Sequence, residues 1–430
     1  MTDMASLLIK GGHVISPEDQ LDGELDVLVE DGVIRRISPQ ISAAADEILE
    51  AAGKVVSPGF VDIHVHLREP GGEISETLET GLAAAVAGGF TAVCPMPNTK
   101  PVIDRPELVR AMMDKAQRIG LARVLPIAAL SMASQGESLT DFARLVATGA
   151  VGFSDDGKPV KTAGLLKRAL EMSREHNALI MDHCEDPSLS SVGVVNEGPV
   201  SKQLKVRGIP SASEDVGVAR DLIVAESVGA RLHVCHVSTV RSVELVRLAK
   251  RRGIRVTCEA TPHHFTLTDQ AVLERGTNAK VNPPLRSAQD VEAVVAGLRD
   301  GTVDAIASDH APHAPELKAK PLASDAPFGL IGLETALALA LTQLVHTGQI
   351  SMWHLVSLMS TNPARIVNQP YGRLSVGGPA DLTIFDPQLE WTYNAAAGRS
   401  KSRNSPFDGW KLKGAVIATV VGGKVVCRRT

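Results

Sequence analysis

Polar and apolar residues alternate at the start of the segment VDIHVHLREPG, residues 61–71. The apolar positions are valine or isoleucine, and the positions between them carry Asp62, His64 and His66. A period of two predicts a strand whose polar residues share one face. Two neighbouring imidazoles on a strand form a chelating pair for a first-row metal, most often zinc, and Asp62 could orient one of them. A polar turn follows the strand directly, which favours a metal site over a pair of ordinary surface histidines.

The two ends of the chain share another pattern, in which short apolar runs are separated by glycine-containing turns. Near the N-terminus, Asp31-Gly32 stands between two apolar runs, which is a strong hairpin signal. Near the C-terminus, Gly422-Gly423 separates similar runs. We therefore predict one small β-sandwich domain that is assembled from residues 1–57 and 371–430.

Between these ends, apolar runs alternate with helical stretches. The predicted strands are Phe60–His66, Thr91–Cys94, Arg123–Ala129, Ala150–Phe153, Leu179–Asp182, Arg231–Val234, Arg255–Glu259 and Ala305–Ser308. The predicted helices include Leu139–Ala147, Leu165–His176, Val216–Val228 and Val240–Arg251. Eight strands over roughly 250 residues, each followed by a helix or a long loop, predict a (β/α)8 barrel of the α/β class over residues 58–370. An open doubly wound sheet is disfavoured because no glycine-rich phosphate loop follows the first strand.

Residues suited to metal binding and acid–base chemistry gather where the predicted strands end. They are His64, His66, Asn98, Asp155, Asp156, Asp182, His183, His236, Asp309, His310 and His313. The carboxyl ends of barrel strands form the active-site face. Each residue alone is more often structural, but the convergence of histidines and aspartates on one face favours a metal-dependent active site. Among the other histidines, His233 shares a strand face with Cys235 and not with His236, so it should face away from a ligand. His263 and His264 should support ligands or fix a loop.

Composition narrows the class of protein. The chain has 430 residues, 44% of them hydrophobic, and a net charge of −5 without a basic block, so we expect no nucleic-acid partner. The most apolar helix, around Thr335 to Val345, is too short to cross a bilayer, and the N-terminus has no signal-peptide pattern. The five cysteines form neither a CxxC pair nor a disulfide framework, which indicates a reducing cytoplasm.

Several motifs resemble those of the cyclic amidohydrolases, and most closely the bacterial class I dihydroorotases. The motifs are HVHLREPG, PMPNTKP, FSDDG, HVCHVST, CEATPHH and SDHAPH, together with the split β-domain and the Asn282 to Arg286 run. The resemblance covers nearly the whole chain and is specific as a set, whereas HVH alone indicates only the superfamily. It implies reversible interconversion of (S)-dihydroorotate and N-carbamoyl-L-aspartate in de novo pyrimidine synthesis.

The resemblance also implies a binuclear zinc centre. One metal would be held by His64, His66 and Asp309, the other by His183 and His236, and Asp156 would bridge them. Parity alone leaves Asp155 and Asp156 open as the bridge, because the strand is already turning, and the resemblance favours Asp156.

For substrate binding, the resemblance implies His66, Arg68, Asn98, Asn282, His313 and the backbone of Phe328 and Gly329. Arg68 could bind a substrate carboxylate bidentately. Asp309 would be the catalytic base and then the catalytic acid.

Two other functions compete with this one. A hydantoinase, dihydropyrimidinase or allantoinase shares the barrel and the HxH pair but resembles this chain less at strand four and in the substrate residues. A catalytically silent scaffold for aspartate carbamoyltransferase would have lost metal ligands, and all six are present here. The sequence leaves open a homodimer, a carbamoyltransferase partner and the loop that closes the site.

Overall fold

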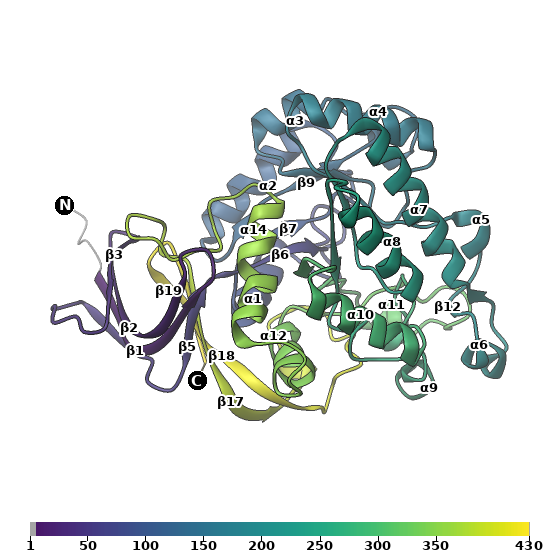
Figure 1. Ribbon diagram of the computed structural model, residues 1–430. Coiled ribbons are helices and arrows are strands. Elements are labelled where there is room, and N and C mark those ends of the chain that lie inside the picture. Colours follow the sequence, from purple (N-terminus) through teal and green to yellow (C-terminus); the bar gives the residue numbers. More distant parts are fainter. Residues whose placement is uncertain (1–5, 430) are drawn as a thin grey trace.

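The computed structural model describes residues 6–429, and both ends of the chain meet in one sheet at one side of the molecule (Figure 1). The sheet runs in the order β19-β18-β17-β5-β1-β2-β3, and β4 pairs with β1. Its strands are β1 (Ser6–Ser16), β2 (Leu21–Glu30), β3 (Val33–Ser38), β4 (Glu47–Glu50), β5 (Val55–Pro58), β17 (Leu382–Thr392), β18 (Lys411–Val421) and β19 (Lys424–Arg428).

This sheet curls around its own apolar core. Asp31 and Gly32 connect β2 to β3 with φ values of 56° and 76°, as a type I′ hairpin requires. At the far edge of β3, the N–H of Ile34 donates to the carbonyl of Gly378 over 3.0 Å, which joins N-terminal and C-terminal segments. Buried side chains from β1 to β5, β17 and β18 form a single cluster. The two ends of the chain therefore share one core.

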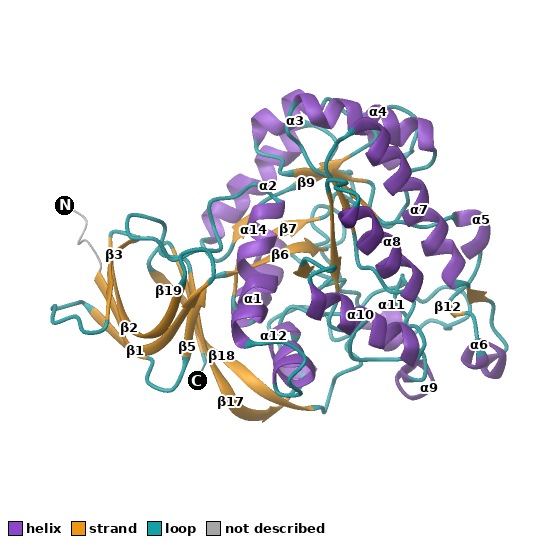
Figure 2. Ribbon diagram, viewed as in Figure 1, coloured by secondary structure: helices purple, strands orange, loops and turns teal. Residues whose placement is uncertain are grey.

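Parallel strands form two larger sheets in the middle of the chain (Figure 2). They are β6 (Phe60–Val65), β7 (Phe90–Pro95), β8 (Arg123–Val124), β9 (Ile127–Ala129), β10 (Gly152–Ser154), β11 (Ile180–Asp182), β14 (Leu232–Val234), β15 (Val256–Ala260) and β16 (Ala305–Ile306). One sheet contains β6-β7-β8 and another contains β9-β10-β11-β14-β15-β16. A parallel bridge between Val65 and His310 connects the last segment back to the first. The predicted strand Arg123–Ala129 is split at Leu125-Pro126, since proline lacks the N–H that a ladder needs.

Helices follow most of these strands and cover them (Figure 2). The longer ones are α1 (Leu78–Ala87), α2 (Pro106–Ile119), α3 (Phe142–Thr148), α4 (Ala163–Glu175), α7 (Ser211–Val228), α8 (Val240–Arg251) and α10 (Ala288–Asp300). The prediction for α8 is confirmed at both ends. In contrast, α7 begins five residues before the predicted Val216. Its first turn buries the polar residues Ser213 and Glu214, which give no apolar signal in the sequence.

Short elements fill the loops at the carboxyl ends of the strands, the connection to β17 and the connection from β17 to β18. They are η1 (Met132–Ser134), α5 (Pro187–Ser190), β12 (Val195–Asn196), α6 (Pro199–Leu204), β13 (Gly208–Ile209), α9 (Ala271–Arg275), η2 (Gly276–Ala279), α11 (Pro315–Lys318), α12 (Ala336–Ala340), η3 (Leu341–Val345), α13 (Met352–Val356), η4 (Ser357–Thr361), α14 (Asn362–Ile366) and η5 (Ala395–Ala397). Within residues 6–429, no helix combines the length and apolar character needed to span a membrane.

The first parallel strand changes its packing before it reaches the site. Val61 and Ile63 belong to one buried cluster, whereas Val65 belongs to another, and the β6–β7 ladder shifts register between Asp62 and Val65. The predicted alternation therefore does not continue regularly to the end of the strand. This irregularity lies at His64, the first of the predicted metal ligands.

Candidate metal centre and active site

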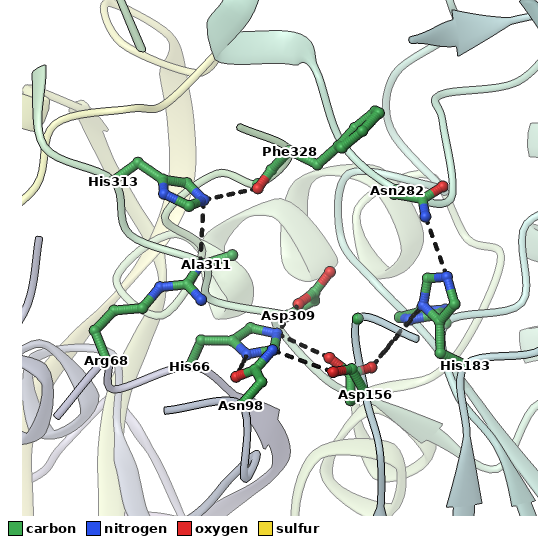
Figure 3. Close-up of a pocket in the computed structure, with 13 residues that line it drawn as sticks. His66, Arg68, Asn98, Asp156, His183, Asn282, Asp309, Ala311, His313 and Phe328 are labelled. Carbon is green, nitrogen blue, oxygen red and sulfur yellow. Dashed lines mark hydrogen bonds and ion pairs between the residues drawn. The ribbon is translucent and has the colours of Figure 1, made fainter. Parts of the chain in front are cut away.

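The carboxyl ends of the parallel strands surround one cavity of about 170 Å³ (Figure 3). It is lined by every residue predicted to bind substrate, namely His66, Arg68, Asn98, Asn282, His313, Phe328 and Gly329. His66 is also a predicted metal ligand, and four further predicted ligands, Asp156, His183, His236 and Asp309, line the cavity as well. His64 is fully buried beside them. The structure thus brings together residues that lie more than 260 positions apart in the chain.

The two histidines of the first strand point at the aspartate that follows β16. The Oδ1 atom of Asp309 lies 3.0 Å from His66 Nε2 and 3.7 Å from His64 Nε2. The two imidazole rings are 5.4 Å apart between centroids. These three side chains therefore present one ligand atom each to a common point.

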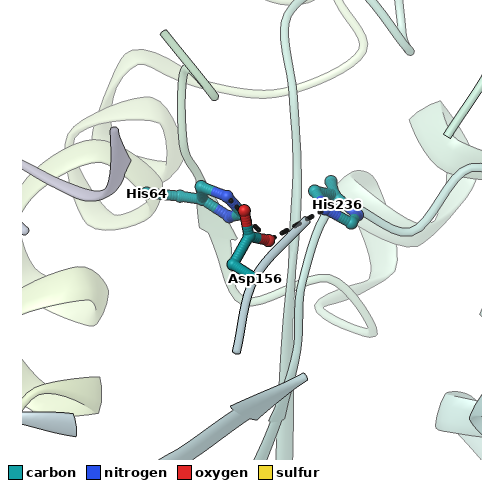
Figure 4. Close-up of side chains that lie close together, drawn as sticks. All are labelled: His64, Asp156 and His236. Carbon is teal, nitrogen blue, oxygen red and sulfur yellow. Dashed lines mark ion pairs between the residues drawn. The ribbon is translucent and has the colours of Figure 1, made fainter. Parts of the chain in front are cut away.

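Asp156 lies between these side chains and a second pair of histidines. His183 Nδ1 and His236 Nε2 are 3.0 Å apart. Asp156 Oδ1 lies 3.4 Å from His64 Nε2 and 3.8 Å from His236 Nε2 (Figure 4). The same oxygen lies 3.9 Å from His183 Nδ1 (Figure 3). The other oxygen of Asp156 lies 3.4 Å from His66 Nε2. Asp156 is thus within reach of both groups of ligands.

The neighbouring carboxylate has a different role. Asp155 accepts a hydrogen bond from the Ser131 N–H over 3.0 Å and another from the Ser131 hydroxyl. It therefore ties the end of β10 to the loop after β9. Of the two aspartates that the sequence left open, only Asp156 faces the histidines.

The donor set fits a divalent metal ion. His64 Nε2 and Asp156 Oδ1 are buried and have no hydrogen-bond partner within residues 6–429. Buried polar atoms are seldom left unpaired, and imidazole nitrogens with carboxylate oxygens are ligands that zinc prefers. Burial opposes ionisation of Asp156 and Asp309, but the surrounding imidazoles outweigh it and hold the pKa of each carboxyl below its usual range. Both side chains are therefore anionic at neutral pH.

A cationic side chain also lines the cavity, on the side of His66 and Asn98 (Figure 3). Arg68 Nε donates to the carbonyl of Pro312 over 3.0 Å, and its Nη2 lies 3.2 Å from His313 Nε2. The same ring nitrogen lies 2.7 Å from the carbonyl oxygen of Phe328. Burial lowers the pKa of Arg68 to about 10, so the guanidinium stays charged at neutral pH. Burial and the charge of Arg68 lower the pKa of His313 to about 2, which keeps that ring neutral.

Two asparagines line the cavity and also contact the histidines. Asn98 Oδ1 lies 3.0 Å from His66 Nδ1, and its amide nitrogen donates to the backbone carbonyl of Asp156 over 3.3 Å. Asn282 Nδ2 lies 3.1 Å from His183 Nε2 and 2.9 Å from a carboxylate oxygen of Glu185. Each asparagine therefore touches one of the predicted ligands as well as the cavity.

Comparison with known proteins identifies the family. A family profile described as Dihydro-orotase-like matches residues 53–242. The dihydroorotase of Geobacter sp. (strain M21) is 50% identical over 98% of this chain and 99% of its own. That of Acetivibrio thermocellus is 48% identical over the same shares. The chain belongs to the dihydroorotase family. The family and the enzyme class predicted from the sequence are thereby confirmed.

Solved structures extend the likeness of this dihydroorotase-family chain to other cyclic amidases. An L-hydantoinase (dihydropyrimidinase) from Arthrobacter aurescens has a TM-score of 0.88 at 28% identity, over 98% of this chain and 96% of its own. A D-hydantoinase (dihydropyrimidinase) from Thermus sp. has a TM-score of 0.83 at 26% identity, over 98% and 95%. The fold is therefore shared with hydantoinases, whereas the higher sequence identity is with dihydroorotases.

Some site residues of this dihydroorotase-family chain were missed from the sequence. Glu259 lies 2.6 Å from His64 Nδ1 and 3.1 Å from His233 Nε2. His233 does not reach the cavity itself, but it is joined to His64 through this carboxylate. Asn404, from the C-terminal part, bonds the backbone around His313. The available signal for Glu259 was an acidic residue at the end of the predicted strand Arg255–Glu259.

Two expected supporting residues act on the backbone rather than on a ligand ring. Asp62 accepts hydrogen bonds from the N–H groups of His64 and Ser308, and so ties β6 to the segment after β16. Asp62 therefore acts on His64 through its backbone N–H. His264 Nε2 lies 3.0 Å from the carbonyl oxygen of Pro283 and fixes the loop beside Asn282.

Proposed function

We propose that this protein is a zinc-dependent dihydroorotase that interconverts (S)-dihydroorotate plus water with N-carbamoyl-L-aspartate in pyrimidine synthesis. The observation that carries the proposal is one cavity in which a cluster of metal-ligand residues faces the guanidinium of Arg68. Dihydroorotate has a carboxylate that an uncharged cyclic amide lacks, and a buried carboxylate needs a cationic partner. Sequence identity to proteins named dihydroorotase supports the same substrate.

In the proposed centre, His64, His66 and Asp309 would hold one zinc ion, His183 and His236 the second, and Asp156 would contact both. Bound zinc ions supply a water activated at neutral pH and polarise the amide carbonyl. Asp309 faces the cavity as a carboxylate, so it can take the proton of the attacking water and return it to the departing amide nitrogen.

Substrate orientation would come from Arg68 and other residues that line the cavity. Within residues 6–429, Arg68 Nε donates to the carbonyl of Pro312, Nη2 lies beside His313 Nε2, and Nη1 has no hydrogen-bond partner. The Nη1 and Nη2 side of the guanidinium can therefore grip a carboxylate as a fork. Asn98, Asn282, His313 and the backbone of Phe328 and Gly329 would complete the pose around the ring.

The proposed architecture is an eight-membered parallel barrel over residues 58–370, with residues 1–57 and 371–430 as the β-domain. The bridge between Val65 and His310 supports closure of the barrel, because it links the first strand to the segment after the last. The homodimer and the aspartate carbamoyltransferase partner stay predictions. Light scattering of the purified protein, with and without that enzyme, tests both.

The test of function combines metal analysis with kinetics on dihydroorotate, dihydrouracil and hydantoin. We expect two zinc ions per chain and the highest kcat/KM for dihydroorotate. A preference for an uncharged ring would favour the hydantoinase-like function. Metal-loaded protein without turnover of any of the three would favour the silent scaffold.

A further inference from the structure

A chain of buried polar side chains leads from His64 away from the cavity. His64 Nδ1 lies 2.6 Å from Glu259 Oε1, Glu259 Oε2 lies 3.1 Å from His233 Nε2, and His233 Nδ1 lies 2.8 Å from Thr257 Oγ1. The side chains of His64, His233 and Glu259 have an exposed fraction of 0%. The chain of contacts joins β6 to β15 and β14. It therefore extends from His64, a predicted metal ligand, into the interior of the sheet.

The chemistry of these groups fixes the direction of each hydrogen bond. An ionised carboxylate only accepts, so both imidazoles must donate an N–H to Glu259. His64 therefore carries its proton on Nδ1 and keeps the lone pair on Nε2. Nε2 is the nitrogen that points at Asp156 and Asp309, over 3.4 and 3.7 Å. His233 donates from Nε2, and its Nδ1 accepts from the hydroxyl of Thr257.

We propose that Glu259, His233 and Thr257 form a positioning relay that fixes the ring and the tautomer of His64 for metal binding. The relay rests on the metal centre proposed above. A carboxylate partner orients a ligating imidazole and raises its basicity. His233 holds the second oxygen of Glu259, so the carboxylate is fixed at both ends.

The relay acts on one of the two proposed metal positions. His64 lies with His66 and Asp309, its partners at one proposed metal position, and it also lies near Asp156 and His236. The Nδ1 atom of His66 faces the neutral amide of Asn98 instead of a carboxylate. Loss of Glu259 should therefore weaken the ion at His64 much more than the ion at His183 and His236.

Two variants of the full-length, zinc-loaded protein test the relay. Glu259→Gln keeps the shape of the side chain, but an amide cannot accept from both imidazoles. His233→Phe removes one donor while it keeps a ring in the sheet. The matched control is Cys258→Ala on the same strand, because Cys258 is equally buried and its Sγ lies 3.4 Å from the carbonyl oxygen of Thr302, away from the relay.

Zinc affinity is measured at each position by competition with a chromophoric chelator, and imidazole N–H protons are observed by NMR. We expect Glu259→Gln to weaken one of the two zinc ions by about 10- to 100-fold, the usual effect of losing such a partner. His233→Phe should weaken the same ion by a smaller factor. The His64 N–H resonance should move upfield in both variants, and Cys258→Ala should match the wild type.

Wild-type affinity and an unmoved His64 resonance in both variants would overturn the relay while the proposed function stands. Equal weakening of both zinc ions would overturn it as well, because the relay touches only His64. If the wild type binds no zinc, the proposed function fails and the relay fails with it. If Glu259→Gln does not fold, His233→Phe decides on its own.

Discussion

The side-chain oxygen of Asn404 accepts a hydrogen bond from the backbone N–H of His313 over 3.1 Å. The amide nitrogen of Asn404 donates to the carbonyls of Ala311 and Gly329 over 3.1 and 3.0 Å. Asn404 is almost fully buried and lies between η5 and β18. One side chain of the C-terminal segment therefore holds together the two loops that carry His313 and Gly329.

Asn404→Asp should raise KM for dihydroorotate with little change in zinc content. The carboxylate keeps the size of the side chain but cannot donate to the two carbonyls, so both loops lose their anchor. A displacement of about 1 Å in a positioning group can cost about 10²-fold in kcat/KM. Steady-state kinetics and metal analysis check the expectation. Ser402→Ala is the control, since Ser402 is buried in the same segment and bonds Ser75 instead; equal losses in both variants would contradict the anchoring role.

Arg68→Met should separate charged from uncharged substrates. The change touches none of the proposed metal ligands, so zinc content should stay at the wild-type level. Dihydroorotate should lose about 2–5 kcal/mol of transition-state binding, as expected when one partner of a buried charge pair is removed. The kcat/KM for dihydrouracil should change little. Arg110→Met, at an exposed position on α2, is the matched control. An equal loss for both substrates would argue against carboxylate recognition by Arg68.

Asp309→Asn should abolish turnover more completely than it reduces metal binding. Asparagine can still offer an oxygen to zinc, but it cannot accept and return a proton. We expect kcat to fall by at least about 10²-fold, the lower end for general acid–base catalysis. Zinc content and kcat are measured on the same preparation. Asp304→Asn is the control for loss of a carboxylate in this segment, because Asp304 directly precedes β16 and Asp309 follows it. Near-normal turnover in Asp309→Asn with zinc retained would remove Asp309 from the proton transfer.

The cluster of proposed ligands could be predicted because each member lies at or just after the end of a recognisable strand, and parallel strands bring their carboxyl ends to one face. Glu259 and His233 could not be placed in the same way. The partner of Glu259 lies 195 positions away in the chain, and no local pattern reports that contact. Asn404 presents the same problem, with partners 75 to 93 positions away.

The ends of helices could also be predicted where neighbouring residues set them, but not where a distant contact sets them. The ends of α8 were predictable because Thr239 caps its first turn and apolar residues recur on one face. The start of α7 was not, since Glu214 is buried there to accept from the Ser238 N–H and to pair with Arg286. A buried charge that serves a distant partner looks like a surface residue in the sequence.

Partial chelation should remove the two metals unequally. One ion would have His64, His66 and Asp309 as dedicated ligands in addition to Asp156, whereas the other would have only His183 and His236. The second ion should therefore leave first, which gives two steps in a plot of zinc content against chelator concentration. A His183→Ala variant should show only the more resistant step. A single step with simultaneous loss of both ions would contradict the unequal sites.

A buried lysine holds the segment that lines the cavity at Phe328. The Nζ atom of Lys318 donates to the carbonyls of Pro327 and Gly329 over 3.0 and 2.9 Å. Only 5% of Lys318 is exposed, and burial together with the charge of Lys280 lowers its pKa from 10.5 to about 7. Above pH 7 the folded protein therefore releases a proton that the unfolded chain retains until about pH 10. In this range the unfolded state binds more protons, so this group makes stability rise with pH.

Lys318→Met should remove the rise of stability with pH that Lys318 causes. Relative to the variant, the wild type should gain free energy of unfolding between pH 7 and 9, with a slope that approaches about 1.4 kcal/mol per pH unit, the value for one proton. The variant should therefore compare best with the wild type at the low end of this range, where part of the wild type still carries the buried charge. Urea titrations of both proteins at pH 7, 8 and 9 measure the difference. Lys320→Met, an exposed lysine two positions away, should follow the wild type at every pH. A stability difference between Lys318→Met and wild type that does not vary with pH would show that Lys318 keeps its ordinary titration.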